Sequence, residues 1–161
     1  MKYIFLAVSA FLAIVAQMIA GNNFFLFNFL DLSLVFIAYW AIYRNRTQAL
    51  FVGSLTGLML DAVLGWPLGF NGFGKTIAAF TIGQVAKHFN VEAAWIRFIL
   101  IAGSSCLSSL SMFALWALLA RPYSSLFLGA SVMQAIITGA TGSLIFTLMD
   151  LYAQTHVKKA S

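Results

Sequence analysis

The sequence predicts an all-α integral membrane protein with about six transmembrane helices. Hydrophobic residues make up 62% of its 161 residues and charged residues only 8%, whereas soluble domains carry roughly 25% charged residues. The apolar residues fall in six blocks, and a helix of about 20 such residues crosses the hydrocarbon core of a bilayer. Six helices with short loops use up the chain, so we expect a single transmembrane domain over residues 1–161.

The first two blocks cover residues 3–20 and 24–43. The first follows Lys2 and imitates a signal peptide, but its apolar core is longer than the roughly 7 to 15 residues of such signals. We therefore expect it to be retained as a helix. The second block contains Asp31 and ends in the segment AYWAIYRNR.

The third block, residues 48–65, carries a row of small residues. Gly53, Gly57 and Gly65 recur with Asp61 at four-residue spacing, which keeps all four roughly on one face of a helix. Glycines spaced in this way let a second helix approach closely. That second helix can belong to this chain or to a partner, and the spacing does not distinguish the two.

A glycine-rich segment, WPLGFNGFG, separates the third block from the fourth. We predict a turn or a short re-entrant segment there, since irregular backbone at membrane depth must be buried against other helices. The fourth block, residues 73–90, places Lys75 and Lys87 about 18 Å apart along a helix. Both lysine side chains must extend toward the interfaces if this block crosses the membrane.

The last two blocks, residues 97–120 and 126–150, are the longest. Five serines surround the single cysteine in the first of them, but a serine nucleophile is disfavoured without a nearby base. One cysteine cannot build a disulfide framework, and neither histidine has a partner at metal-ligand spacing. We expect no enzymatic activity, cofactor or metal. In the last block Ala135, Gly139 and Ser143 form a second row of small residues, which we expect to pack inside the chain.

The basic residues predict the orientation of the helices. With six helices, seven of the nine lysines and arginines fall on the face that holds both termini, and Lys75 and Arg121 fall on the other. Because basic loops are enriched on the cytoplasmic side, we expect both termini there. The same distribution explains the net charge of +5 through contact with anionic lipid headgroups, so no nucleic-acid partner is expected.

Two carboxylates lie within the membrane in this arrangement. Asp31 is expected roughly 10 Å below the outer surface, and Asp61 about one turn from the outer end of its helix. Lys75 enters from the same side. An ionised side chain at such depth costs at least about 2.5 kcal/mol. Three roles compete for these residues: helix packing through hydrogen bonds or an ion pair with Lys75, binding of a partner helix or a small ligand, and acid–base catalysis.

The block from Asp31 to Gly69 resembles the MreD family, the small rod-shape-determining membrane proteins of the bacterial cell-elongation machinery. Its members show an aspartate opening a hydrophobic helix, a tyrosine-bearing segment ending in basic residues, and G…GLxxD followed by LG. Here these features stand as DLSLVFIAYWAIYRNR, GSLTGLMLD and PLG. There are two departures: Leu30 stands where a proline often occurs, and Lys75 belongs to no motif of the family.

The resemblance implies a non-enzymatic scaffold of lateral cell-wall synthesis in the bacterial inner membrane. The implied partners are an MreC-like single-span protein and, through it, the elongation-complex glycosyltransferase, transpeptidase and actin-like filament. Asp31, Gly57, Asp61 and Gly69 are carried over as motif positions for helix packing or partner binding. The family in turn resembles the substrate-binding subunits of energy-coupling-factor vitamin transporters, so a subunit of a small-solute transporter is the alternative, on fold analogy alone.

Overall fold

The computed structural model describes residues 29–119 and 126–159, together with residue 15. The described helices are α2 Leu32–Tyr43, α3 Arg46–Leu64, α4 Phe70–His88, α5 Ala94–Leu118 and α6 Leu126–Lys159. Regular structure in this part of the chain is entirely helical, in agreement with the predicted class. The helix expected over residues 3–20 lies outside the described residues.

Three of the described helices are long and apolar enough to cross a membrane: α3, α5 and residues 129–152 of α6. Most residues in these spans are not buried by the rest of the chain, so lipid or a partner must cover their apolar side chains. The protein is therefore a membrane protein. Helix α4 has 19 residues, as α3 does, but it is less apolar and is not one of the three.

Helix α2 corrects the prediction for the second block. It has 12 residues, rises about 18 Å and is too short to cross a hydrocarbon core of roughly 30 Å. Leu30 and Asp31 are not helical, so the continuous helix expected over residues 24–43 does not form. The cause is local, because the Asp31 carboxylate accepts a hydrogen bond from the backbone N–H of Leu34 at 3.0 Å. An aspartate in this position caps the start of a helix.

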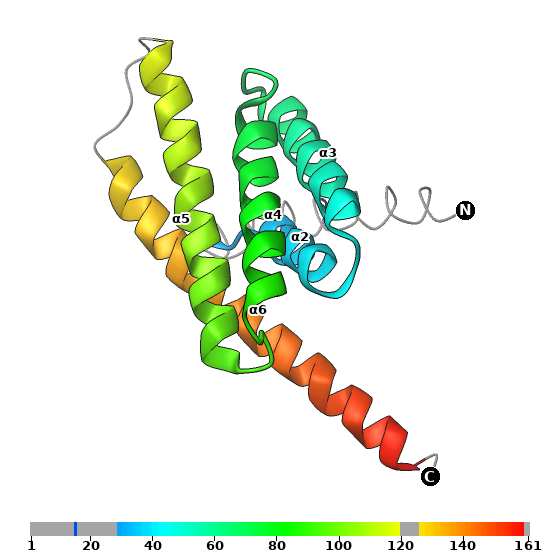
Figure 1. The fold of residues 1–161 in the computed structure, drawn as a ribbon. Coiled ribbons are helices and arrows are strands. Elements are labelled where there is room, and N and C mark those ends of the chain that lie inside the picture. The colour runs from blue at the N-terminus through cyan, green and yellow to red at the C-terminus, as the bar shows by residue number, and fades with distance from the viewer. Residues whose placement is uncertain (1–14, 16–28, 120–125, 160–161) are drawn as a thin grey trace.

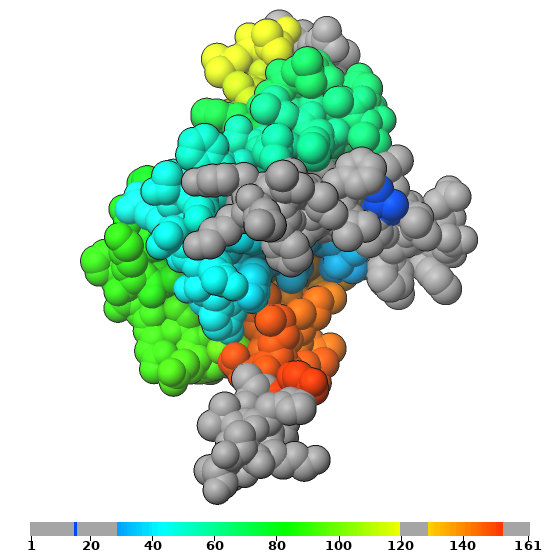
Figure 2. Space-filling view, turned by 90° about the vertical axis from the view of Figure 1, so that its right-hand side faces the viewer, coloured from blue at the N-terminus to red at the C-terminus, as the bar shows by residue number. Residues whose placement is uncertain are grey.

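Helices α3, α4 and α5 are antiparallel neighbours, and α6 crosses α5 (Figure 1). The α2–α3 and α4–α5 connections lie at one end of the bundle with the exposed residues Arg44 and Lys87; this is called the basic end below. The turn between α3 and α4 lies at the opposite end. In the space-filling view the end of α2 and the start of α3 (cyan) lie between residues of α4 (green) and of α6 (orange) (Figure 2).

Apolar side chains from all five described helices share one core. Its most deeply buried large members are Leu34, Ile37, Val52, Ile82, Ile101 and Phe146. Lipid tails are as apolar as these side chains, so burying them provides little of the driving force that it provides in water. Close packing and polar contacts must therefore hold the helices together, and both are found around the carboxylates.

Helix α6 continues beyond the predicted block. It has 34 residues, rises about 51 Å, and ends at Lys159 instead of near residue 150. Figure 1 shows its last turns extending past the basic end of the other helices. The added residues, LYAQTHVKK, are more polar than the predicted block and end in two lysines. The apolar block therefore marked where the apolar part of this helix ends and not where the helix itself ends.

Candidate functional site

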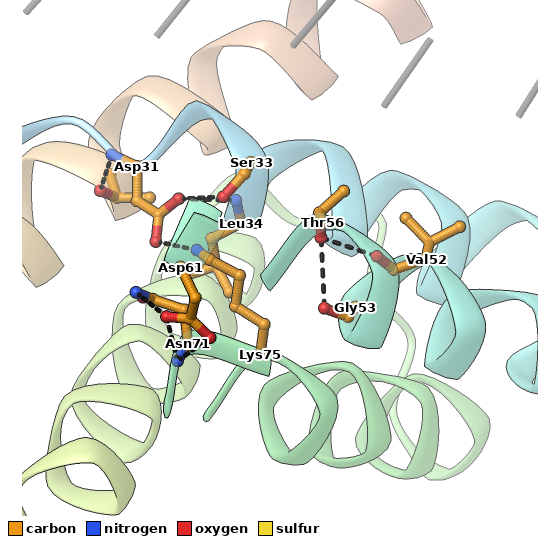
Figure 3. A network of polar contacts seen from close by, with 10 residues as sticks. Asp31, Ser33, Leu34, Val52, Gly53, Thr56, Asp61, Asn71 and Lys75 are labelled. Atoms are coloured by element: carbon orange, nitrogen blue, oxygen red, sulfur yellow. Dashed lines mark hydrogen bonds and ion pairs between the residues drawn. The ribbon is translucent and has the colours of Figure 1, made fainter. Parts of the chain in front are cut away.

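Asp61 is fully buried in the last turn of α3, and its carboxylate faces the start of α4 (Figure 3). Its Oδ2 accepts a hydrogen bond from the backbone N–H of Gly69 at 2.9 Å. Its Oδ1 accepts from the backbone N–H of Asn71 at 3.0 Å and from the Asn71 amide at 2.9 Å. The first N–H groups of a helix have no partner within it, and the helix dipole favours a negative charge there. Asp61 thus caps the N-terminus of α4 from a neighbouring helix.

The turn between α3 and α4 is closed by the same residue. The backbone oxygen of Asp61 accepts the N–H of Trp66 at 2.9 Å, at the end of α3. Gly65 and Gly69 have φ angles of 66° and 103°, in the left-handed region that favours glycine. A Cβ at Gly65 would meet nothing within 4 Å. Gly65 therefore serves the turn and does not share the close helix contact that the four-residue spacing predicted for it.

Gly53 and Gly57 lie where α3 packs against α4. A Cβ at Gly57 would lie 2.5 Å from the backbone oxygen of Asn71 and 2.5 Å from the Cα of Gly72. A Cβ at Gly53 would lie 2.8 Å from the backbone oxygen of Lys75. Helix α4 can approach this closely only because α3 has no side chain at these positions. The helix that occupies the glycine face of α3 thus belongs to the same chain.

Asp31 and Lys75 form a buried ion pair between α2 and α4. The Lys75 Nζ lies 2.5 Å from Asp31 Oδ2, and the two side chains are 2% and 8% exposed. Asp31 Oδ1 also accepts the Ser33 hydroxyl at 2.6 Å. The backbone N–H of Asp31 donates to the hydroxyl of Thr138 in α6 at 3.0 Å. Helices α2, α4 and α6 are therefore connected through Asp31.

The ion pair lies well inside the bundle, far from the basic end. From Lys75 to His88, the last residue of α4, the helix rises about 20 Å, and α2 rises about 18 Å between the basic end and Asp31. The two residues thus lie at about the same distance from the basic end. Both side chains are buried and an isolated buried charge is costly, so each partner provides the neutralising charge that the other needs.

A second polar cluster joins α5 to α6 nearer the basic end. Arg97 is 3% exposed and pairs with Asp150, and its Nε donates to the backbone oxygen of Val91 at 2.6 Å. The Tyr43 hydroxyl donates to Asp150 Oδ1 at 3.3 Å. The sequence analysis counted Arg97 only among the seven basic residues of the face that holds both termini, and it missed Asp150. The position of Asp150 could have indicated the pair. It is the last residue of the sixth apolar block, and that block was expected to end on the same face as Arg97.

The second row of small residues lies between α6 and α5. A Cβ at Gly139 would lie 2.9 Å from the Cβ of Ala102. The Ser143 hydroxyl donates to the backbone oxygen of Ala94 at 2.7 Å, and Ala135 is buried. This row therefore brings α6 close to α5 in the way that the glycines of α3 bring in α4.

The two intramembrane carboxylates have separate partners. Lys75 pairs with Asp31 and not with Asp61, while Asp61 is occupied by the start of α4 (Figure 3). Sequence reasoning missed Asn71 and Thr138, because short polar residues are common in turns and membrane helices and their spacing does not identify a partner. Within residues 29–119 and 126–159, no group of three or more His, Cys, Asp or Glu residues is placed to hold a metal ion.

The model of the family described as rod shape-determining protein MreD matches residues 1–155, nearly the whole chain. The match includes the positions of Asp31, Gly57, Asp61 and Gly69. No curated protein and no solved structure matches the chain. Because this match covers nearly the whole chain, the chain belongs to the MreD family of rod shape-determining membrane proteins.

Proposed function

We propose that this MreD-family protein is a non-enzymatic scaffold of the bacterial cell-elongation complex. In this proposal it binds an MreC-like single-span protein and, through it, the glycosyltransferase, the transpeptidase and the actin-like filament of lateral wall synthesis. Membership of a rod shape-determining family supports an association with the elongation complex, because the family functions with the MreC and MreB shape machinery.

The proposal rests on one observation: the buried charged groups of α3, α4 and the start of α2 bond to groups of the same chain. Asp61 accepts its hydrogen bonds from the start of α4, and Asp31 and Lys75 pair with each other. Acid–base catalysis requires a group within reach of a substrate proton, and a solute site requires polar groups directed into a cavity. A network bonded within the chain instead fixes the positions of the helices, which is what a scaffold needs.

We also propose that the protein is a multi-pass protein of the inner membrane with both termini in the cytoplasm and six membrane-crossing segments, the second of which contains the short helix α2 and cannot cross by that helix alone. The distribution of charge supports this orientation, because Arg44 and Lys87 lie at the basic end and the basic C-terminus of α6 extends past it (Figure 1). The spacing of two tryptophans supports a membrane crossing by α5. Trp95 and Trp116 stand about 32 Å apart along α5, close to the thickness of the hydrocarbon core, and tryptophans are enriched at the two interfaces.

Affinity purification from native membranes in mild detergent tests this function. Bound proteins and bound small molecules are identified in the same sample, with an unrelated tagged multi-pass protein as the control. We expect a single-span protein with a periplasmic domain to be enriched over the control. Recovery of a stoichiometric small molecule or an ATPase module, without that partner, would instead support the transporter-subunit alternative.

A further inference from the structure

One partly exposed arginine at the basic end is held in a fixed position against α4. Arg46, the first residue of α3, donates a hydrogen bond from its Nη1 to the side-chain oxygen of Gln84 at 2.8 Å. Its guanidinium carbon lies 4.3 Å from the centre of the Phe80 ring, within the range of a cation–π contact. Gly83 leaves room for this side chain, because a Cβ there would lie 3.2 Å from Cγ of Arg46. Three residues of α4 thus fix the position of this charge.

The chain provides no acidic partner for Arg46. It has four acidic residues, and in the part of the chain that the structure describes none of their side chains forms an ion pair with Arg46. Three of the four bond to the partners described above: Asp31, Asp61 and Asp150. The fourth, Glu92, is exposed and accepts a hydrogen bond from the Asn90 side chain at 3.3 Å. A neutralising anion for Arg46 therefore has to come from outside the chain.

The length of α3 places Arg46 at the level of the phospholipid headgroups. Helix α3 is one of the three helices that are apolar enough to cross the membrane. Its 19 residues rise about 28 Å, close to the thickness of the hydrocarbon core, roughly 30 Å. Its first residue therefore lies near the boundary between acyl chains and headgroups, where the lipid phosphates are found. A guanidinium suits a phosphate because its planar N–H groups donate two parallel hydrogen bonds.

The surface of α4 beside Arg46 suits the rest of a phospholipid. Phe73, Phe80 and Lys87 recur at seven-residue spacing and so share one face of the helix. The two phenylalanines are 51% and 45% exposed, and they form an apolar surface on the side of Arg46 that points away from the basic end. Lys87 is exposed on the other side. A second positive charge there favours an anionic headgroup.

We propose that Arg46 and Lys87 bind the headgroup of one anionic phospholipid, whose acyl chain lies along Phe80 and Phe73. Arg46 donates to the phosphate, and Gln84 and Phe80 hold its guanidinium in place. A phospholipid is favoured over free inorganic phosphate because the charged and apolar surfaces adjoin each other. The proposal is independent of the scaffold function, since it requires only that α3 crosses the membrane.

A lipid competition assay on the purified full-length protein tests the ligand. Binding of a fluorescent phosphatidylglycerol is measured in mixed detergent micelles, with phosphatidylglycerol, phosphatidylcholine and inorganic phosphate as competitors. We expect phosphatidylglycerol to compete at least about fivefold better than phosphatidylcholine, and phosphate not to compete. Equal competition by the two lipids would overturn the assignment to an anionic phospholipid. Displacement by inorganic phosphate would show a simple anion site and would overturn it as well.

Two arginines at the same end give a matched pair of variants. Arg46→Gln and Arg44→Gln each remove one positive charge from the basic end, but the contacts with Phe80 and Gln84 belong to Arg46. We expect Arg46→Gln to weaken phosphatidylglycerol binding about tenfold and Arg44→Gln to weaken it less than about threefold. Equal losses would mean that the lipid responds only to the overall charge of this end, and the proposed site would be wrong.

A second pair displaces the guanidinium without changing the charge. Gly83→Leu fills the space beside the Arg46 side chain, whereas Gly103→Leu adds the same side chain on α5, where a Cβ meets nothing within 4 Å. We expect Gly83→Leu to weaken binding about as much as Arg46→Gln, and Gly103→Leu to leave it unchanged. Unchanged binding by a folded Gly83→Leu would overturn the proposal. Each variant is first checked for a native unfolding temperature, and if Gly83→Leu does not fold, the two arginine variants decide.

Discussion

Asp61 shows how a carboxylate is accommodated in a membrane helix without an ion pair. Its two oxygens accept hydrogen bonds from the backbone of Gly69 and from Asn71, so the negative charge lies at the positive end of α4. The aspartate of the GLxxD motif then acts by shaping the turn that follows it. Replacing it should affect folding first and function only through folding.

We expect Asp61→Leu to destabilise the protein by at least about 2 kcal/mol, because it leaves several N–H groups of α4 without an acceptor. Asp61→Asn keeps one acceptor and should have a smaller effect. Thermal unfolding in detergent measures both, and Glu92→Gln is the control, since Glu92 is an exposed acid whose replacement should change stability by less than about 0.5 kcal/mol. Unchanged unfolding of Asp61→Leu would contradict the capping role.

The Asp31–Lys75 pair is tested by a double-mutant cycle. Removing one partner of a buried pair leaves the other charge uncompensated and typically costs about 3–5 kcal/mol. We therefore expect Lys75→Met and Asp31→Asn each to be clearly destabilising. The double variant should lose less unfolding free energy than the two single variants lose in sum. Additive effects on unfolding would mean that the pair contributes no coupling.

At this scale the sequence predicted which residues matter better than it predicted their partners. Asp31, Asp61 and Lys75 were singled out because each is a charged residue within an apolar block, but the depth expected for Asp31 was counted along a helix that does not form. The choice of Asp31 as the partner of Lys75 depends on how α2 lies against α4, which no local pattern specifies. The Arg97–Asp150 pair was missed for the same reason, since its members are far apart in the sequence.

At the scale of elements, the α3–α4 hairpin depends on the absence of side chains at two positions. A Cβ at Gly57 would lie 2.5 Å from backbone atoms of α4, and backbone cannot move aside as a flexible side chain can. We expect Gly57→Ala to destabilise the protein by about 1–3 kcal/mol. Gly103→Ala is the matched control, because alanine there meets open space and should be neutral or stabilising by up to about 1 kcal/mol. Equal unfolding temperatures for the two variants would contradict the close contact.

The observed bounds of α3, α4 and α5 lie within three residues of the apolar blocks, whereas α2 and α6 differ more. Hydropathy averages over a window, so it does not register a cap such as Asp31, which starts α2 in the middle of an apolar run. It also does not detect a helix that continues past its apolar residues, as α6 does beyond residue 150. The start of α2 and the end of α6 depend instead on capping and on helix propensity.

At the scale of the whole molecule, the orientation proposed from the charges makes a prediction about labelling. In a Cys106→Ala background, Leu68→Cys introduces an exposed thiol in the α3–α4 turn and Lys87→Cys introduces one at the basic end. We expect a membrane-impermeant maleimide to label Leu68→Cys in intact spheroplasts and Lys87→Cys only after permeabilisation. The reverse pattern would invert the topology.

The fold class followed from composition because few charged residues and long apolar blocks have one stable solution in a bilayer, the helix. The arrangement of the helices did not follow, since the rows of small residues predicted close contacts without naming the neighbour. The glycine face of α3 could have met a foreign helix, and in the structure α4 occupies it.

The most direct test of the central claim compares folded protein and bound partner in one experiment. The claim is that Asp61 serves the scaffold by holding its own helices. Membranes containing native protein or Asp61→Asn are solubilised, the folded fraction is measured by size-exclusion fluorescence, and the single-span partner is quantified in the same eluate. We expect the partner to decrease in proportion to the folded protein, so that their ratio stays constant. A variant that folds to the native level but loses its partner would contradict the claim and assign Asp61 to the binding surface.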